Sequence, residues 1–345
     1  MKGRLERLRA GLERPLLVTD PVNVLYLTGL SSSNAAVLVE PGRARLYTDF
    51  RYVERARAAE GAEVVETPRA VLPALAGLLD GTIGFEADHV TYMGWQTLGA
   101  HGLALVPTQG VVEALRAVKE PGELDAIRAA CAISDRAFEA LSQERFTGRT
   151  ERELAWRLDQ LLRELGGEGP AFETIVAAGE NGSRPHAVPG DRPIEAGTLV
   201  TIDAGTTVGG YRSDCTRTFA TGALPDELAR IYEVCLEAQE AGVAAVRPGI
   251  TGVEGDAASR RVIVAAGYGE QFGHGLGHGV GLNIHEAPAL RPESTDTIVA
   301  GNTVTVEPGI YLPGVGGVRI EDLVTVTEDG CERLTRFTKS LITVS

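Results

Sequence analysis

Residues 196–205 read AGTLVTIDAG and residues 300–309 read AGNTVTVEPG, so one pattern occurs twice in the later part of the chain. The alignment places Asp203 on Glu307. An Arg-x-acid triplet follows each copy and ends at Asp214 in the first copy and at Glu321 in the second. Chance similarity between glycine-rich strands could produce one of these matches, but not readily both. We therefore expect two related halves in which four acids occupy equivalent hairpins.

The first acid pair predicts a charged hairpin. With the turn centred on the Val208–Gly209 bond, Asp203 lies directly opposite Asp214. Directly opposed residues have Cβ atoms roughly 5 Å apart, and two unpaired carboxylates at that separation repel each other. A cation should therefore lie between them. An arginine of the same hairpin, Arg212 or Arg217, could serve in this role as well as a metal ion.

The second acid pair favours metal ions. Glu307 and Glu321 flank another glycine-rich turn, YLPGVGG, and the repeat predicts that the two hairpins meet about a pseudo-two-fold axis. Four carboxylates cannot all be buried without compensation, and hard divalent cations commonly bind sites that are rich in oxygen ligands. Two such ions would balance four acids.

The histidines point to the same region. Three of the six histidines lie in FGHGLGHGVGLNIHEAP, residues 272–288, as His274, His278 and His285, and His186 lies earlier in the same half of the chain. No phosphate-binding glycine motif and no GxSxG nucleophile elbow can be drawn through this segment. We expect these glycines to let the backbone approach substrate and metal ions.

The pattern of elements predicts two domains. Residues 16–118 alternate short strand-like and helix-like segments, which is typical of an α/β domain. A charged break at Lys119–Gly122 follows, and residues 123–144 then carry an apolar stripe at helical spacing. We place the domain boundary at this break, between a domain of residues 1–118 and an α+β domain of residues 119–345, in which helices flank a mostly antiparallel sheet.

Composition excludes several classes of function. A formal net charge of −14 argues against a nucleic-acid partner, because phosphate binding needs clustered cationic side chains. No apolar run is long enough for a membrane span or a signal peptide. The four cysteines form no CxxC pair and are interpreted as free thiols of a reducing compartment. We expect a cytoplasmic protein without a membrane partner.

The five acid and histidine positions together resemble a known family. Asp203, Asp214 eleven residues later, His278 in HGLGHGVGLxxHExP, Glu307 in VEPGIY and Glu321 in RIED are similar to the metal ligands of the pita-bread metallopeptidases (family M24). The earlier domain, with YLTGL and LYTDFRY, resembles the N-terminal domain of the prolidase and aminopeptidase P group. The resemblance covers nearly the whole chain.

The resemblance implies a mechanism and roles for single residues. Asp214 and Glu321 would bridge two metal ions, Asp203 would bind one of them, and His278 with Glu307 would complete the other. A hydroxide between the ions would attack the bond before a proline in short peptides, with Glu307 as a proton shuttle. His186 and His285 would be catalytic residues that contact the reacting carbonyl, although each could instead orient a neighbouring residue. His274, Tyr311 and Arg319 would line the substrate site, although Arg319 could instead form a structural ion pair with Asp203.

Some choices remain open at this stage. The resemblance favours Mn²⁺, while Co²⁺ or Zn²⁺ would suit the same ligands, and it implies a homodimer. It does not separate a prolidase-like dipeptidase from an aminopeptidase P that acts on longer peptides. Alternative functions are a non-catalytic peptide-binding module on the same fold and an aminopeptidase of other specificity, such as methionine aminopeptidase. Methionine aminopeptidases typically lack the first domain, while the non-catalytic members and creatinase lack the metal ligands.

Overall fold

Residues 2–345 are described by a computed structural model. The chain divides into two compact units, one that extends to Arg116 and one that begins at Ala117. Helix α6 (Val111–Ala117) ends at this division. The domain boundary after residue 118 stays a prediction of the sequence. None of the helices in residues 2–345 is both long and apolar enough to cross a membrane.

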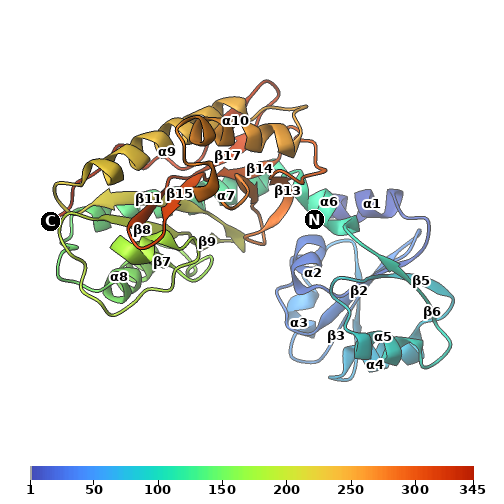
Figure 1. Cartoon of the computed structure of the whole chain (residues 1–345). Helices are drawn as coiled ribbons and strands as arrows, with labels where there is room; N and C mark the ends of the chain where they lie inside the picture. Colours follow the sequence, from blue (N-terminus) through green and yellow to red (C-terminus); the bar gives the residue numbers. More distant parts are fainter. Residues whose placement is uncertain (1) are drawn as a thin grey trace. The chain divides into compact units, whose positions relative to one another are not determined.

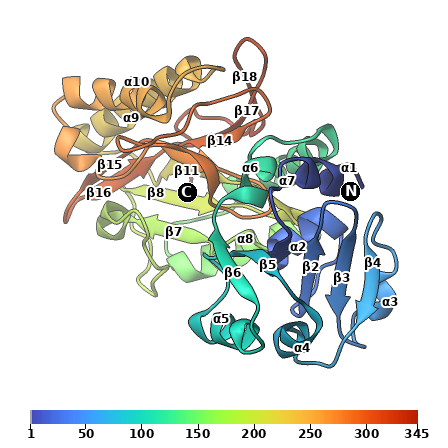
Figure 2. The ribbon, with the colours of Figure 1, turned by 90° about the vertical axis from the view of Figure 1, so that its right-hand side faces the viewer.

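The N-terminal unit is built around one mixed sheet with the strand order β4-β3-β2-β1-β5-β6, and β2, β3 and β4 lie side by side in Figure 2. Strand β2 pairs antiparallel with β1 and β3, whereas β5 pairs parallel with β1 and β6. The strands are β1 (Leu16–Val18), β2 (Ala35–Val39), β3 (Ala44–Thr48), β4 (Glu63–Glu66), β5 (Thr82–Glu86) and β6 (Ala104–Thr108). The other helices are α1 (Lys2–Ala10), α2 (Pro21–Thr28), α3 (Val53–Ala56), α4 (Val71–Leu78) and α5 (Tyr92–Gly99).

Local sequence signals explain where several helices begin. Helix α2 has Asp20 as its N-cap, with the side chain accepting a hydrogen bond from the Val22 amide, and Pro21 occupies the first turn. Proline suits that position because a backbone N–H in the first turn has no acceptor within the helix, so the N–H that proline lacks costs no hydrogen bond there. The same effect appears in α7, which begins at Pro121. The Pro-Gly break seen in the sequence is therefore the first turn of a helix rather than a gap before it.

The C-terminal unit repeats one plan, a pair of helices followed by antiparallel strands. Helices α7 and α8 precede the sheet β11-β8-β7, and helices α9 and α10 precede the sheet β13-β12-β14-β17-β18. In Figure 1 the strands lie between α9 with α10 on one side and α8 on the other. The helices are α7 (Pro121–Ser142), α8 (Glu151–Glu164), α9 (Asp226–Ala245) and α10 (Gly252–Ala265), with short 3₁₀ turns η1 (Gly179–Ser183) and η2 (Gly269–Gln271).

The strands of this unit form two sheets and two short hairpins, β9/β10 and β15/β16. The first half contains β7 (Ile175–Ala178), β8 (Leu199–Ala204), β9 (Thr207–Val208), β10 (Tyr211–Arg212) and β11 (Cys215–Ala220). The second half contains β12 (Gly277–Gly279), β13 (Glu286–Leu290), β14 (Thr303–Val306), β15 (Gly309–Leu312), β16 (Gly316–Arg319), β17 (Asp322–Val326) and β18 (Cys331–Arg333).

Each half has its own hydrophobic core. Residues of α7 and α8, such as Phe138 and Leu158, pack with β8 and β11 in one buried cluster. Residues of α9 and α10, such as Ile231 and Ile263, pack with β14 and β17 in another. The inner ends of the two sets of strands carry the acids that the sequence analysis selected. All four cysteines are free, and Cys215 is buried.

The predicted register of the first hairpin is wrong by two residues. Asp203 pairs with Thr216 and not with Asp214. The turn lies at Gly209 and Gly210, whose φ angles of 58° and 82° suit a two-residue turn of the twist that hairpins favour, so its centre is one residue later than expected. Since side chains alternate with a period of two, Asp214 remains on the same face as Asp203, although it is no longer directly opposite.

Candidate functional site

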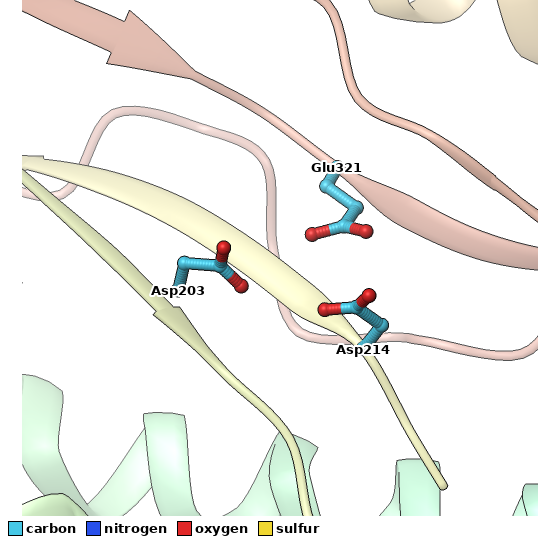
Figure 3. Close-up of side chains that lie close together, drawn as sticks. All are labelled: Asp203, Asp214 and Glu321. Carbon is cyan, nitrogen blue, oxygen red and sulfur yellow. The ribbon is translucent and has the colours of Figure 1, made fainter. Parts of the chain in front are cut away.

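Three carboxylates from different strands converge in the C-terminal unit. Asp203 lies near the end of β8, Asp214 directly precedes β11, and Glu321 directly precedes β17. Each offers an oxygen atom, and these atoms all lie within 4.8 Å of one another. Figure 3 shows the three side chains directed toward a common space. Asp214 and Glu321 are 4% and 1% exposed, so their negative charges are placed where water cannot stabilise them.

The electrostatics of this cluster favour a cation. Burial raises the pKa of Asp214, and the nearby charges of Glu321 and Asp203 raise it further. Burial and neighbouring acids likewise raise the pKa of Glu321. Within residues 2–345, buried Asp203 Oδ1 and Glu321 Oε1 have no hydrogen-bond partner. Buried polar atoms without partners are costly, and oxygen ligands of this kind fit divalent metal ions.

His278 and Glu307 extend the cluster on one side. His278 Nε2 lies 3.2 Å from Glu307 Oε1 and 3.7 Å from Asp214 Oδ2. Its Nδ1 lies 3.1 Å from the carbonyl oxygen of Gly279, which can only accept, so Nδ1 carries a hydrogen and Nε2 faces the acids. A backbone contact of this type commonly orients a metal-binding histidine.

The Glu307–His278 pair is better balanced than the three carboxylates. Burial alone would raise the pKa of Glu307, but the hydrogen bond and charge of His278 lower it to about 2. Burial opposes the charged form of His278, yet Glu307 raises the pKa of His278 overall. Thus the five predicted ligands form one connected group, in which Asp214 and Glu321 carry most of the uncompensated charge.

Arg319 is held entirely by internal contacts. Its guanidinium donates to Asp203 Oδ2 at 2.8 Å, to Thr216 Oγ1 at 3.1 Å and to the hydroxyl of Tyr311 at 3.0 Å. It also donates to the carbonyl oxygen of Pro185, and the residue is only 4% exposed. The ion pair with Asp203 is the alternative that the sequence left open for Arg319.

Tyr311 connects Arg319 to His274. The Tyr311 hydroxyl lies 3.0 Å from His274 Nε2, and His274 Nδ1 lies 2.8 Å from the carbonyl oxygen of Gly275. Burial lowers the pKa of His274 and raises that of Tyr311 to about 12, so both are neutral near pH 7. Tyr311 therefore donates to Nε2, and both nitrogens of His274 are occupied. The imidazole presents carbon atoms to its surroundings.

The other two predicted histidines lie beside this group. The rings of His285 and His278 meet edge to face with centroids 4.3 Å apart. Burial and the neighbouring His278 lower the pKa of His285, so it is largely neutral near pH 7. His186 is exposed on the segment between η1 and β8, next to the Pro185 carbonyl that Arg319 contacts.

Sequence reasoning missed several supporting residues. Thr216 Oγ1 donates to Glu321 Oε2 at 2.8 Å, and Thr305 Oγ1 donates to Glu307 Oε1 at 2.9 Å. Asp322, next to Glu321, was also missed, and it pairs with Arg217 at 2.9 Å. Arg217, which the sequence offered as a cation between Asp203 and Asp214, therefore does not fill that role: it lies on the opposite face of the strands and also donates to the backbone carbonyl of Glu321. Thr216 and Thr305 each lie two residues from a predicted ligand, Asp214 and Glu307, and this spacing, which puts them on the ligand's face of the strand, was the only signal in the sequence.

The glycines around His278 bring strands together. A Cβ atom at Gly277 would clash with the carbonyl group of Thr305, and one at Gly279 would clash with the carbonyl group of Ala287. Strand β12 can therefore pack between its neighbours β13 and β14 only because residues 277 and 279 have no side chain. The close approach that we expected toward substrate and metal ions is, at these two positions, an approach to adjacent strands.

Comparisons with known proteins agree with this geometry. Residues 125–328 match the model of metallopeptidase family M24, and residues 4–118 match that of the creatinase/prolidase N-terminal domain. An Xaa-Pro dipeptidase of Pyrococcus furiosus is 36% identical over 363 residues, covering 99% of this chain and 100% of that protein.

Solved structures give the same result. An Xaa-Pro dipeptidase from Bacillus anthracis has a TM-score of 0.96 at 40% identity, covering 99% of each chain. An X-Pro aminopeptidase from Thermotoga maritima has a TM-score of 0.91 at 34% identity, covering 99% of this chain and 100% of that one. Because the family match spans most of the C-terminal unit and the relatives align along the whole chain, the protein belongs to metallopeptidase family M24, with a creatinase/prolidase N-terminal domain before a pita-bread catalytic domain.

Proposed function

We propose that this protein hydrolyses the Xaa-Pro bond at the N-terminus of short peptides in a metal-dependent reaction. The observation that carries this proposal is the buried group of Asp203, Asp214 and Glu321, in which two carboxylate oxygens have no partner among residues 2–345. The Xaa-Pro dipeptidase and X-Pro aminopeptidase among its relatives support the choice of substrate.

We propose that two divalent cations, preferably Mn²⁺, are held by Asp203, Asp214, His278, Glu307 and Glu321. Bound metal ions supply an activated water molecule at neutral pH and polarise the scissile carbonyl. The donor set also suits Co²⁺ or Zn²⁺, because it combines one imidazole with carboxylate oxygens.

Three residues are proposed to act on the reacting atoms. Glu307 is ionised near neutral pH, since its pKa is about 2 before any metal binds, and its carboxylate can accept a proton from the attacking water. His285 and His186 can donate hydrogen bonds to the carbonyl oxygen as negative charge develops on it. The neutral state of His285 leaves one ring nitrogen protonated for this purpose.

The substrate wall is proposed to be formed by His274, Tyr311 and Arg319. With its two nitrogens engaged by Gly275 and Tyr311, His274 offers an apolar ring surface that suits a proline side chain. Arg319 would contribute mainly by holding Asp203 and Tyr311 in place, because its donors already point to internal acceptors.

The cellular setting and the assembly are part of the same proposal. We propose a cytoplasmic homodimer whose substrates are short proline-containing peptides, with no nucleic-acid or membrane partner. The relatives include both a dipeptidase and an aminopeptidase, so dipeptides and longer peptides are both candidate substrates.

Hydrolysis assays test the proposal directly. Metal-stripped protein would be given Ala-Pro, Ala-Pro-Ala or Ala-Ala-Ala, with and without Mn²⁺, alongside an Asp214→Ala variant. We expect Mn²⁺-dependent cleavage of the proline peptides only, lost in the variant, and the ratio of dipeptide to tripeptide cleavage would identify the subclass. If no metal restored cleavage of any peptide, the protein would be a peptide-binding module on this fold. Cleavage of a Met-Ala peptide in preference to Ala-Pro would indicate methionine aminopeptidase specificity.

A further inference from the structure

The position of His186 depends on its backbone. The side chain is exposed, and within residues 2–345 no hydrogen bond holds the imidazole. It lies on the segment of residues 178–190, which leaves β7, forms η1 and continues toward β8. A ring without a side-chain partner can act at a fixed place only if this segment is itself fixed.

One buried carboxylate joins the two ends of that segment. Glu151, the first residue of α8, is 5% exposed. Its Oε1 accepts from the amide of Ala178 at 2.7 Å, and its Oε2 accepts from the amide of Gly190 at 2.7 Å. Oε2 also accepts from the side chain of Asn181 at 2.8 Å. The carboxylate therefore closes the segment at both ends, and the N-terminus of α8 further favours its negative charge.

The middle of the segment is held against the catalytic hairpin. Arg319 donates to the carbonyl oxygen of Pro185 at 3.1 Å, one residue before His186. Gly182 of η1 lies so close to Gly317 of β16 that a Cβ atom on Gly317 would clash with the Gly182 carbonyl group. The base of the segment is thus fixed by Glu151, and its inner side is fixed by β16.

We propose that Glu151 is a positioning residue, which acts through His186 by holding both ends of residues 178–190. This inference rests on the proposed function of His186 at the reacting carbonyl. A carboxylate suits the task because all of its lone pairs are acceptors, so it can bind two backbone amides and one side-chain amide together. A glutamine has only one acceptor oxygen, and its NH₂ group would face a backbone N–H.

The test is Glu151→Gln in the full-length, Mn²⁺-loaded protein. We expect kcat for Ala-Pro or Ala-Pro-Ala to fall by about 10- to 100-fold, because small misplacements of reacting groups have effects of that size. The Kd for Mn²⁺ should not change, since Glu151 contacts no proposed ligand. The matched control is Glu153→Gln, the same change two residues later on the exposed side of α8, where glutamine can still cap the helix. It should keep wild-type kcat.

A double-mutant cycle separates positioning from general stability. In a His186→Ala background, Glu151→Gln should cause no further loss, because the group that it positions is already absent. Equal losses in both backgrounds, or an unchanged kcat in Glu151→Gln, would overturn the inference.

Asn181→Ser provides a second route if Glu151→Gln does not fold. It removes one of the three donors and should give a smaller loss of kcat that again disappears in the His186→Ala background; a loss that persists there would count against the inference. A wild-type protein that cleaves no proline peptide would instead contradict the proposed function.

Discussion

The two hairpins that carry the acids follow one sequence pattern but differ in register and in charge balance. In the second hairpin, the pairs Val306–Asp322 and Gly309–Arg319 place Glu307 opposite Glu321. In the first hairpin, Asp203 is opposite Thr216, and Asp214 lies two positions away along the strand. The two sequence repeats therefore carry the same types of residue on corresponding strands, but the acids are paired differently between the two strands of each hairpin.

The acids of the two hairpins also differ in how well their charges are balanced by neighbouring groups. Glu307 has a cationic partner in His278, and its pKa is lowered to about 2. Asp214 lies farther from His278, at 3.7 Å, and burial with the charges of Glu321 and Asp203 raises its pKa. In the metal-free protein, one acid therefore stabilises the fold through an ion pair, while the other opposes it. Metal ions would be needed mainly to balance acids such as Asp214, whose charge is opposed by burial and by the neighbouring acids.

The largest expected effects come from exchanging one acid of each kind for its amide. Asp214→Asn and Glu307→Gln should each lower Mn²⁺-dependent hydrolysis by about 1,000-fold or more, since each removes a metal ligand and Glu307 is also the proton acceptor. Their effects on the metal-free protein should have opposite signs. Urea unfolding at pH 7 should show Asp214→Asn more stable by roughly 1 kcal/mol and Glu307→Gln less stable by about 2 kcal/mol.

The pH dependence sharpens this contrast. The lowered pKa of Glu307 gives stability that is complete above its ordinary value of 4.5 and is lost as pH falls toward about 2. The raised pKa of His278 gives stability that is complete below its ordinary value of 6.5 and is lost as pH rises through the raised value. The stability difference between wild-type and Glu307→Gln protein should therefore be greatest between pH 4.5 and 6.5. Equal effects of the two substitutions at all pH values would contradict the comparison.

A smaller effect is expected from the link between the hairpins. Thr216 of the first hairpin donates to Glu321 of the second, and Thr216→Val would remove that bond without changing the volume much. Loss of such a supporting contact typically weakens metal binding by about 10- to 100-fold. Calorimetric titration with Mn²⁺ would measure it. Thr207→Val is the control, because the Thr207 hydroxyl makes no hydrogen bond in the described part of the chain, and a similar loss there would count against the role of Thr216.

The smallest effect concerns the turn that sets the first register. Gly210 has a φ angle of 82°, so Gly210→Ala should destabilise the protein by about 1–2 kcal/mol in denaturant unfolding. Gly209→Asn should be nearly neutral, since asparagine tolerates the left-handed region and Asn-Gly is favoured in such turns. If Gly210→Ala were also neutral, the turn would not determine the register as we describe.

The sequence was sufficient for the parts of the site that depend on residue type and repetition. The doubled pattern predicted two halves and located acids that lie together in the structure, and the mostly antiparallel strands of the C-terminal unit follow as expected. Family membership also agrees with the resemblance that the motifs carried. Alternating segments likewise predicted the α/β character of the first domain.

The sequence was insufficient where a one-residue shift of a turn sets the strand register, or where a contact between distant residues positions a side chain. The register of Asp203 depends on whether the turn is centred on Val208–Gly209 or on Gly209–Gly210, and the turn residues 207–210 allowed either choice. The role of Glu151 depends on a hydrogen bond to Gly190, 39 residues away, which no local pattern announces. The Tyr311–His274 contact similarly joins segments separated by 37 residues.

The glycines on either side of His278 have a practical consequence for protein engineering. Any side chain at Gly277 or Gly279 would clash with a neighbouring carbonyl group, so the residues on either side of His278 in β12 cannot be substituted. New specificities would have to be built from segments that can accept larger residues, such as the exposed positions near His186. The least adaptable part of this enzyme is formed by residues that have no side chain to alter.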